Sequence, residues 1–114
     1  MADVVTAGDE LRSAAAAFNG RRSEALQRDD TDAFGALNRQ LLSVERAFLD
    51  AVGIPGRPWY RHLIYAPKFT YAPELLPGVA EAVDAADHAR AQAQAERLAI
   101  ALRKASALLR AAAN

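Results

Sequence analysis

The chain is 114 residues long, a length that suits one domain able to bury a core without metal or disulfide cross-links. Fourteen basic and fourteen acidic residues give a formal net charge of zero, so the cationic surplus typical of nucleic-acid-binding proteins is absent. The sequence has no cysteine, which excludes disulfides and thiolate ligands, and no apolar run near the roughly 20 residues that cross a bilayer. We therefore expect a soluble domain that binds neither nucleic acid nor membrane. Its acidic N-terminus does not resemble a secretory signal and leaves the compartment open.

Two amphipathic helices are predicted in the first half of the chain. The first covers about residues 3–27, where apolar residues recur every seven positions. A polar turn follows, and the second helix covers about residues 31–52 with the strongest apolar periodicity in the chain. Gly53, followed by an apolar residue and Pro55, predicts the end of this helix.

A long loop is predicted over about residues 53–77. All five prolines fall between Pro55 and Pro77, together with five of the eight aromatic residues. Each proline removes a backbone donor and disfavours helix at the preceding residue. Residues 63–65 favour a short extended piece, but the sequence shows no second strand to pair with it. Loops of this length inside a compact helical chain commonly have a functional or docking role.

Helix is predicted again over about residues 78–112, either as one helix or as two with a bend near Asp87 and His88. Pro77 suits the first turn, and neither proline nor glycine occurs from Val79 onward. The predicted fold class is therefore all-α, a bundle of three to four helices with one long loop rich in proline and aromatic residues.

The residues supply no recognisable catalytic site. Only His62 and His88 are available as imidazole ligands, and neither belongs to an H-E-x-x-H pattern. Asp84 and His88 share a helix face and could bind a metal weakly, although an exposed charge pair is the simpler interpretation. Nucleophilic serine, phosphate-loop and dinucleotide-binding motifs are all missing. We expect no catalytic residue, no metal site and no cofactor in this chain.

The loop cluster from Arg57 to His62 permits two interpretations. Arginines and aromatics on a proline-stiffened loop can form a binding surface with little ordering cost. Alternatively, Trp59 and Tyr65 fill the helical core, while the cationic side chains bond loop carbonyls. Glu45 and Arg46 either pair with this loop or remain a solvated pair.

Two segments carry a resemblance to a known family. Residues 45–50 read ERAFLD, and residues 53–67 read GIPGRPWYRHLIYAP. Both closely resemble the C-terminal domain of the glutamate carboxypeptidase family, the transferrin-receptor-like dimerisation domain. The flanking helices match this domain in length and character, so we assign residues 1–114 to it.

The resemblance implies a helical bundle that pairs with its copy in a homodimer and follows a zinc peptidase domain in the parent chain. It also implies that the loop docks this peptidase domain and borders its substrate pocket. In glutamate carboxypeptidases a Lys-Tyr pair reaches that pocket; Tyr71 matches the tyrosine, Thr70 replaces the lysine, and Lys68 is a nearby cation. Glutamate specificity is therefore left open. The expected docking residues are Arg57, Trp59, Tyr60, Arg61, His62 and Tyr65.

A stripe on the last helix is the expected dimer interface, because it is longer than one neighbouring helix needs, although part of it must cover the second helix. The stripe consists of Ala91, Ala95, Leu98, Leu102, Ala105 and Leu109. The alternative function is a free-standing helical interaction module with no link to hydrolysis. Metal-binding motifs upstream in the reading frame would decide between the two. The alanine and arginine content suggests a GC-rich bacterial genome.

Overall fold

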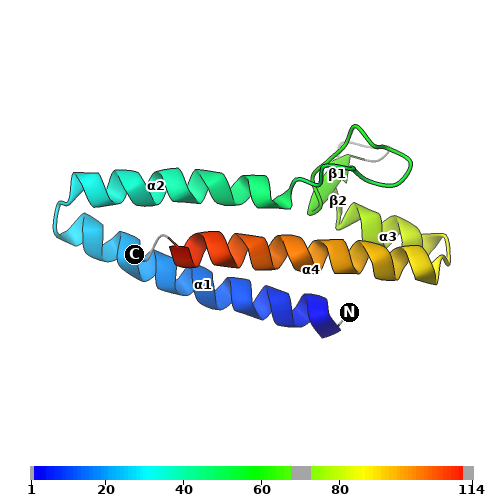
Figure 1. The fold of residues 1–114 in the computed structure, drawn as a ribbon, viewed down its shortest axis with the longest axis horizontal. Helices are drawn as coiled ribbons and strands as arrows, with labels where there is room; N and C mark the ends of the chain where they lie inside the picture. The colour runs from blue at the N-terminus through cyan, green and yellow to red at the C-terminus, as the bar shows by residue number, and fades with distance from the viewer. Residues whose placement is uncertain (1, 68–72, 112–114) are drawn as a thin grey trace.

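The computed structural model describes residues 2–67 and 73–111, which form a helical bundle with a small sheet at one end (Figure 1). The helices are α1 (Ala2–Gln27), α2 (Thr31–Glu45), α3 (Pro77–Asp84) and α4 (His88–Ala111). A 3-10 helix η1 (Arg46–Phe48) extends α2, and strands β1 (Tyr65–Pro67) and β2 (Pro73–Leu75) pair in antiparallel fashion. The predicted all-α class is confirmed, with this two-stranded sheet as an addition.

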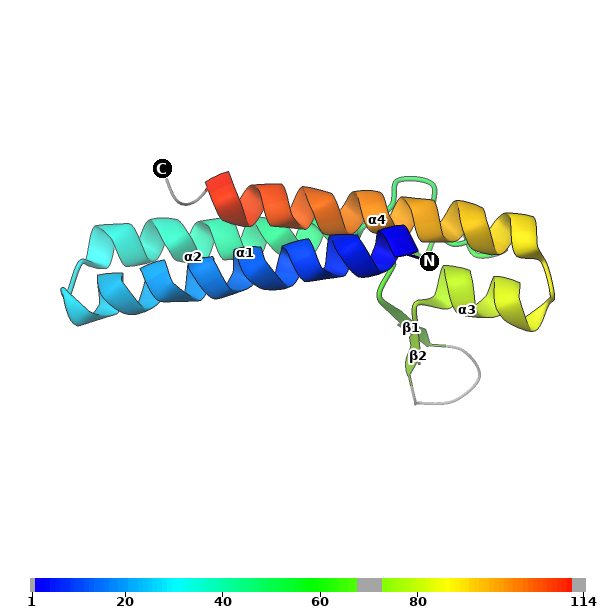
Figure 2. The same ribbon diagram turned by 90° about the horizontal axis from the view of Figure 1, so that it is seen from below.

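The three long helices lie side by side along the long axis of the molecule, which measures 52 × 29 × 22 Å (Figure 2). Helices α1 and α2 form a hairpin, and α4 packs along α1 for most of its length. The turn of the hairpin is capped by Asp30, whose Oδ1 accepts a hydrogen bond from the Ala33 backbone N–H at 3.0 Å. This arrangement places the sheet and α3 at the opposite end from the hairpin turn (Figure 1).

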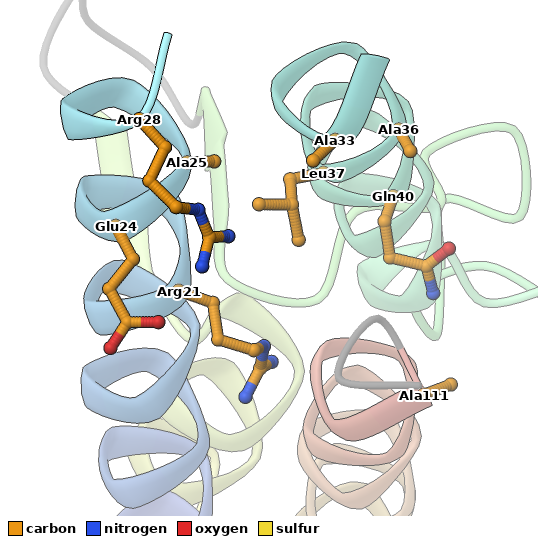
Figure 3. Close-up of a pocket in the computed structure, with 9 residues that line it drawn as sticks. All are labelled: Arg21, Glu24, Ala25, Arg28, Ala33, Ala36, Leu37, Gln40 and Ala111. Atoms are coloured by element: carbon orange, nitrogen blue, oxygen red, sulfur yellow. The ribbon is translucent and has the colours of Figure 1, made fainter. Parts of the chain in front are cut away.

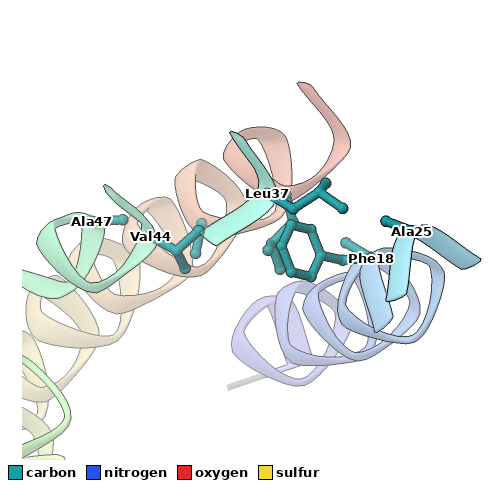
Figure 4. Packing of buried hydrophobic residues seen from close by; sticks show 8 residues of the cluster. Phe18, Ala25, Leu37, Val44 and Ala47 are labelled. Carbon is teal, nitrogen blue, oxygen red and sulfur yellow. The ribbon is translucent and has the colours of Figure 1, made fainter. Parts of the chain in front are cut away.

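The main core is built mostly from small side chains. Phe18 of α1 is 2% exposed and fills the centre of the bundle, facing Leu37 of α2 (Figure 4). Alanines at the helix contacts let the backbones approach closely, as at Ala14 and Ala105. A second, smaller cluster of Leu63, Leu98 and Ala101 lies under the long loop.

The predicted end of the second helix at residue 52 is wrong. The α-helix ends at Glu45, η1 covers three more residues, and Leu49 is extended with φ −92° and ψ 124°. The physical reason is tertiary: Leu49 pairs with His62 in an isolated bridge, and the Asp50 N–H donates to the Arg61 carbonyl at 2.8 Å. These bonds to the loop replace the helical ones.

The expectation that the extended piece near Tyr65 has no partner is also wrong. Tyr65 pairs with Leu75, and Pro67 pairs with Pro73, so both strands carry prolines at the end of a two-stranded ladder. Proline is tolerated at such positions because no further strand requires its missing donor. The prolines argued against a strand in the sequence, but their positions in this ladder allow one.

Of the two alternatives for residues 78–112, the structure confirms two helices with a bend near Asp87 and His88. Helix α3 ends at Asp84, Ala86 has φ +54°, and α4 begins at His88. The Asp87 Oδ1 accepts from the Arg90 N–H at 3.0 Å and so caps the first turn of α4. Helix α3 then folds back onto α4 (Figure 1). Pro77 lies in the first turn of α3, as predicted.

Candidate functional site

The segment from Leu49 to Ile64, which we call the aromatic loop, is fastened to the bundle by three polar contacts. The first is a double hydrogen bond from Arg97 of α4 to Asp50, with Nε and Nη2 each 2.6 Å from a carboxylate oxygen. Asp50 Oδ1 also accepts from the Val52 N–H at 2.8 Å. The hydrogen bond from Arg97 is the main cause that lowers the pKa of the Asp50 carboxyl group, and the Val52 N–H adds to it. Asp50 thus remains ionised and holds the start of the loop on α4.

The second contact fastens the middle of the loop. The Arg57 guanidinium is hydrogen-bonded to Glu81 of α3 and lies 4.0 Å from the Glu74 carboxylate of β2. All three side chains are less than a quarter exposed. Arg57, expected among the docking residues, is therefore directed into the molecule and links the loop to two later elements.

The third contact fastens the end of the loop to α2. His62 Nδ1 accepts from the Ile64 N–H at 3.2 Å, which leaves the proton on Nε2, 2.9 Å from Glu45 Oε1. The imidazole ring centroid lies 4.5 Å from that of Tyr65. The interpretation in which Glu45 meets the loop is thereby confirmed, whereas Arg46 remains exposed.

The outer surface of the loop carries large apolar side chains. Trp59 is 75% exposed, Val52 64% and Leu49 49%, and Tyr65 at the adjoining strand is 47% exposed. The alternative in which Trp59 and Tyr65 fill the core is therefore wrong; Ile54 and Leu63 occupy that place. Exposed apolar side chains on a well-anchored backbone are typical of a protein-binding surface.

The remaining expected site residues have different surroundings. Tyr60 is half-buried and Arg61 is exposed. Lys68 and Tyr71, expected at the substrate pocket, lie outside the described residues. Arg97 and Glu81 hold the loop in place, but the sequence gives little indication of this role. Arg97 directly precedes the apolar stripe residue Leu98, where a charge near the core requires a partner.

The stripe on α4 lies largely inside the chain. Ala95, Leu98, Ala105 and Leu109 are at most 4% exposed, and Ala91 and Leu102 are half-buried. Within one chain the stripe packs against α1 and α2, and its residue Leu98 packs with Leu63 in the second, smaller cluster. The dimer contact expected of these residues stays a prediction, and their exposed surface offers a second copy little area.

A cleft of about 480 Å³ lies at the other end of the bundle, where α4 ends between α1 and α2 (Figure 3). Its polar side chains complete α4: Arg21 Nη2 donates to the Leu109 carbonyl at 2.8 Å, and Gln40 Nε2 to the Leu108 carbonyl at 2.6 Å. The cleft residues are Arg21, Glu24, Ala25, Arg28, Ala33, Ala36, Leu37, Gln40 and Ala111. Helix termination accounts for these contacts.

Over residues 2–67 and 73–111, no group of three or more histidine, aspartate or glutamate side chains is placed to hold a metal ion. In the same part of the chain, none of the helices has the length and apolar character needed to span a bilayer.

Comparison with known proteins gives relatives of one kind. The chain is 41% identical to an inactive zinc metalloprotease of Schizosaccharomyces pombe over 69 residues. This matched segment covers 60% of the chain and 9% of the relative. It is 47% identical over 49 residues to a probable glutamate carboxypeptidase of Arabidopsis thaliana (41% of the chain, 7% of the relative). It is 36% identical over 91 residues to an aminopeptidase of Rattus norvegicus (78% and 11%).

The chain thus spans about a tenth of the length of these relatives. All three are eukaryotic and lend no support to the bacterial origin suggested by composition. The model of one family, the transferrin receptor-like dimerisation domain, matches residues 1–110, nearly the whole chain. With its helical bundle and its anchored loop, the chain belongs to the transferrin receptor-like dimerisation domain family.

Proposed function

We propose that this domain dimerises a larger zinc-dependent exopeptidase of the glutamate carboxypeptidase type and docks its peptidase domain through the aromatic loop. The observation that carries the docking proposal is the exposure of Trp59 on a loop held by Asp50, Arg57 and His62. A loop fixed in advance loses little conformational entropy on binding, and tryptophan is enriched among residues that dominate binding energy.

Zinc belongs to the parent's peptidase domain in this proposal. The described residues of this chain do not fit a zinc site, because no three potential ligands converge among them. In this proposal, hydrolysis takes place in the parent's peptidase domain. Tyr71 and Lys68 are proposed to border the substrate pocket of the parent, with the substrate class set by the peptidase domain.

Docking is tested by titrating the 114-residue chain with the separately produced peptidase domain of the parent. We expect Trp59→Ala to weaken binding by about 2 kcal/mol, the loss typical of a central anchor residue. Ile100→Ala is the matched control, since Ile100 is a large apolar residue of α4 with 67% exposure. Equal binding by both variants would contradict docking through the loop.

The second candidate is a helical interaction module whose parent does not hydrolyse peptides. One observation favours it: the relative from S. pombe is named an inactive zinc metalloprotease. Assay of the full-length parent for zinc content and for release of terminal residues from peptides separates the two candidates. Dimerisation and docking without bound zinc or hydrolysis would support the second.

A further inference from the structure

Apart from the aromatic loop, several exposed large apolar side chains lie on the α1–α2 hairpin. Leu26 at the end of α1 is 67% exposed, and Leu41 and Leu42 of α2 are 43% and 73% exposed. Residues 34, 38, 41 and 42 have the spacing that places side chains along one side of a helix. We call this surface the hairpin face. It consists of Leu26, Phe34, Gly35, Asn38, Leu41 and Leu42.

The hairpin face carries both a hollow and a protrusion. The hollow, about 160 Å³, is lined by the apolar residues Ala25, Leu26 and Phe34, by Gly35, which has no side chain to fill it, and by Asp29, Asp30 and Thr31 at the hairpin turn. Leu42 follows Gly35 by seven residues, two helical turns on the same side, and projects with 73% exposure. A surface that holds an apolar hollow and an apolar protrusion side by side can complement a second copy of itself.

Asn38 lies midway between Phe34 and Leu42, about 6 Å along the helix from each. A two-fold axis through Asn38 and perpendicular to α2 would place Leu42 of each copy on the Phe34 hollow of the other. A residue on such an axis meets its own equivalent, and an amide, which both donates and accepts, can bond to a second amide. A charged residue at this position would repel its copy. The half-buried Asn38 therefore suits the axis.

The charges of α2 favour the antiparallel pairing that this axis produces. Asp30 and Asp32 lie at the start of the helix, and the exposed Arg46 follows its last turn, where Glu45 is already bound to His62. Antiparallel helices bring the acidic start of each copy beside Arg46 of the other and oppose the two helix dipoles. Parallel helices would place like ends together.

We propose that the hairpin face is the contact between two copies of this domain, with α2 packed antiparallel to its equivalent about a two-fold axis at Asn38. The proposal rests on the proposed function, because it assigns the surface through which the domain dimerises. The exposed apolar residue of α4, Ile100, is isolated by comparison, because Glu96, Arg97, Arg103 and Lys104 are its nearest neighbours along the helix.

The size of the hairpin face predicts weak association of the isolated chain. Helix α2 has 15 residues and is therefore about 22 Å long, so with the flank of α1 it supplies less than the roughly 800 Å² per partner of a stable complex. Covalent trapping detects such a contact. The chain has no cysteine, so a single introduced cysteine reports one position without interference.

The test compares single-cysteine variants at Asn38 and Ile100 under mild oxidation and measures the dimer Kd by sedimentation equilibrium. Asn38→Cys is expected to form an interchain disulfide, since equivalent residues on the axis come within the about 4.4–6.8 Å Cα separation that a disulfide requires. Ile100→Cys is expected to stay reduced. Leu42→Asp is expected to raise the dimer Kd about tenfold or more, and Ile100→Asp to leave it unchanged.

Both aspartate variants replace exposed side chains, and circular dichroism verifies that their helix content is preserved. If the unmodified chain dimerises, but Leu42→Asp dimerises equally well and Asn38→Cys is not trapped, the assignment of the face is overturned while dimerisation stands. If the unmodified chain stays monomeric up to millimolar concentration and Asn38→Cys is not trapped, the self-association of this domain is overturned together with the face.

Discussion

The bundle and the aromatic loop differ in where they place large and small side chains. In the bundle, one phenylalanine and a few aliphatic residues are buried among alanines, and the helices are held by close apolar packing. In the loop, the largest side chain, Trp59, faces outward, and polar contacts to α2, α3, α4 and β2 hold the backbone. The comparison indicates that the bundle supplies the stability of the fold, while the loop presents a surface. Substitutions of the buried bundle side chains and of the exposed side chains of the loop should therefore affect different measurements, whereas substitutions that disturb the loop backbone or its polar contacts should still lower stability.

The largest effect is expected from Phe18→Ala in the bundle. Phe18 is the largest side chain at the centre of an alanine-rich core, whose backbones cannot collapse far enough to fill the space. We expect a loss of about 3–5 kcal/mol in the free energy of unfolding, measured by urea denaturation. Ile100→Ala should change it by at most about 0.5 kcal/mol. A small effect of Phe18→Ala would mean that the bundle core contributes less than its packing indicates.

The loop backbone is expected to tolerate alanine at one of its glycines and not at the other. Gly53 and Gly56 both have φ +83°, but a Cβ at Gly53 would lie 2.2 Å from the Pro58 carbonyl oxygen, whereas the space at Gly56 is open. We expect Gly53→Ala to cost about 2–3 kcal/mol in the free energy of unfolding and Gly56→Ala about 1 kcal/mol. Equal losses would show that the chain near Pro58 moves aside easily.

Asp50→Asn tests the strongest polar contact of the loop. The variant removes the charge that accepts both hydrogen bonds from Arg97, and we expect a loss of about 1–3 kcal/mol in the free energy of unfolding. Hydrogen exchange of the Ile54 amide, which donates to the Tyr60 carbonyl inside the loop, should accelerate. Asp9→Asn, which removes an exposed ion pair with Arg12 at 3.8 Å, is the control with an effect near zero.

The same contact has a pH dependence of known sign. The folded-state pKa of Asp50 lies below the ordinary 3.8, so the unfolded chain binds this proton at higher pH than the folded one. The stability from Asp50 is fully present above pH 3.8 and is lost as the pH falls through the lowered value. We expect the stability difference between the unmodified chain and Asp50→Asn to shrink on acidification below that pH. A difference that stays constant would show that the ionised carboxylate is not what holds the loop.

Local rules predicted the features that depend on neighbours along the chain. The position of Pro77 in the first turn of α3 follows from a residue and its immediate context, and the bend near His88 was one of the two alternatives that the sequence left open. The end of α2 and the strand at Leu75 did not follow, because they depend on bonds to residues brought close only by folding. The site shows the same limit. The loop that carries Trp59 is held by Asp50 and Arg57, whose partners in α4 and α3 have at most a weak signal in the sequence.

The smallest effect on stability is expected from Trp59→Ala, although tryptophan is the largest residue in the chain. With 75% of its surface exposed, it buries little area on folding, so its removal should change the free energy of unfolding by at most about 0.5 kcal/mol. The substitution instead removes apolar area that a docked peptidase domain would cover. Thermal unfolding of the isolated chain should therefore be unchanged, while affinity for the peptidase domain falls. A loss of stability comparable to that of Asp50→Asn would mean that Trp59 supports the fold, and the loop would then resemble the bundle more than it differs from it.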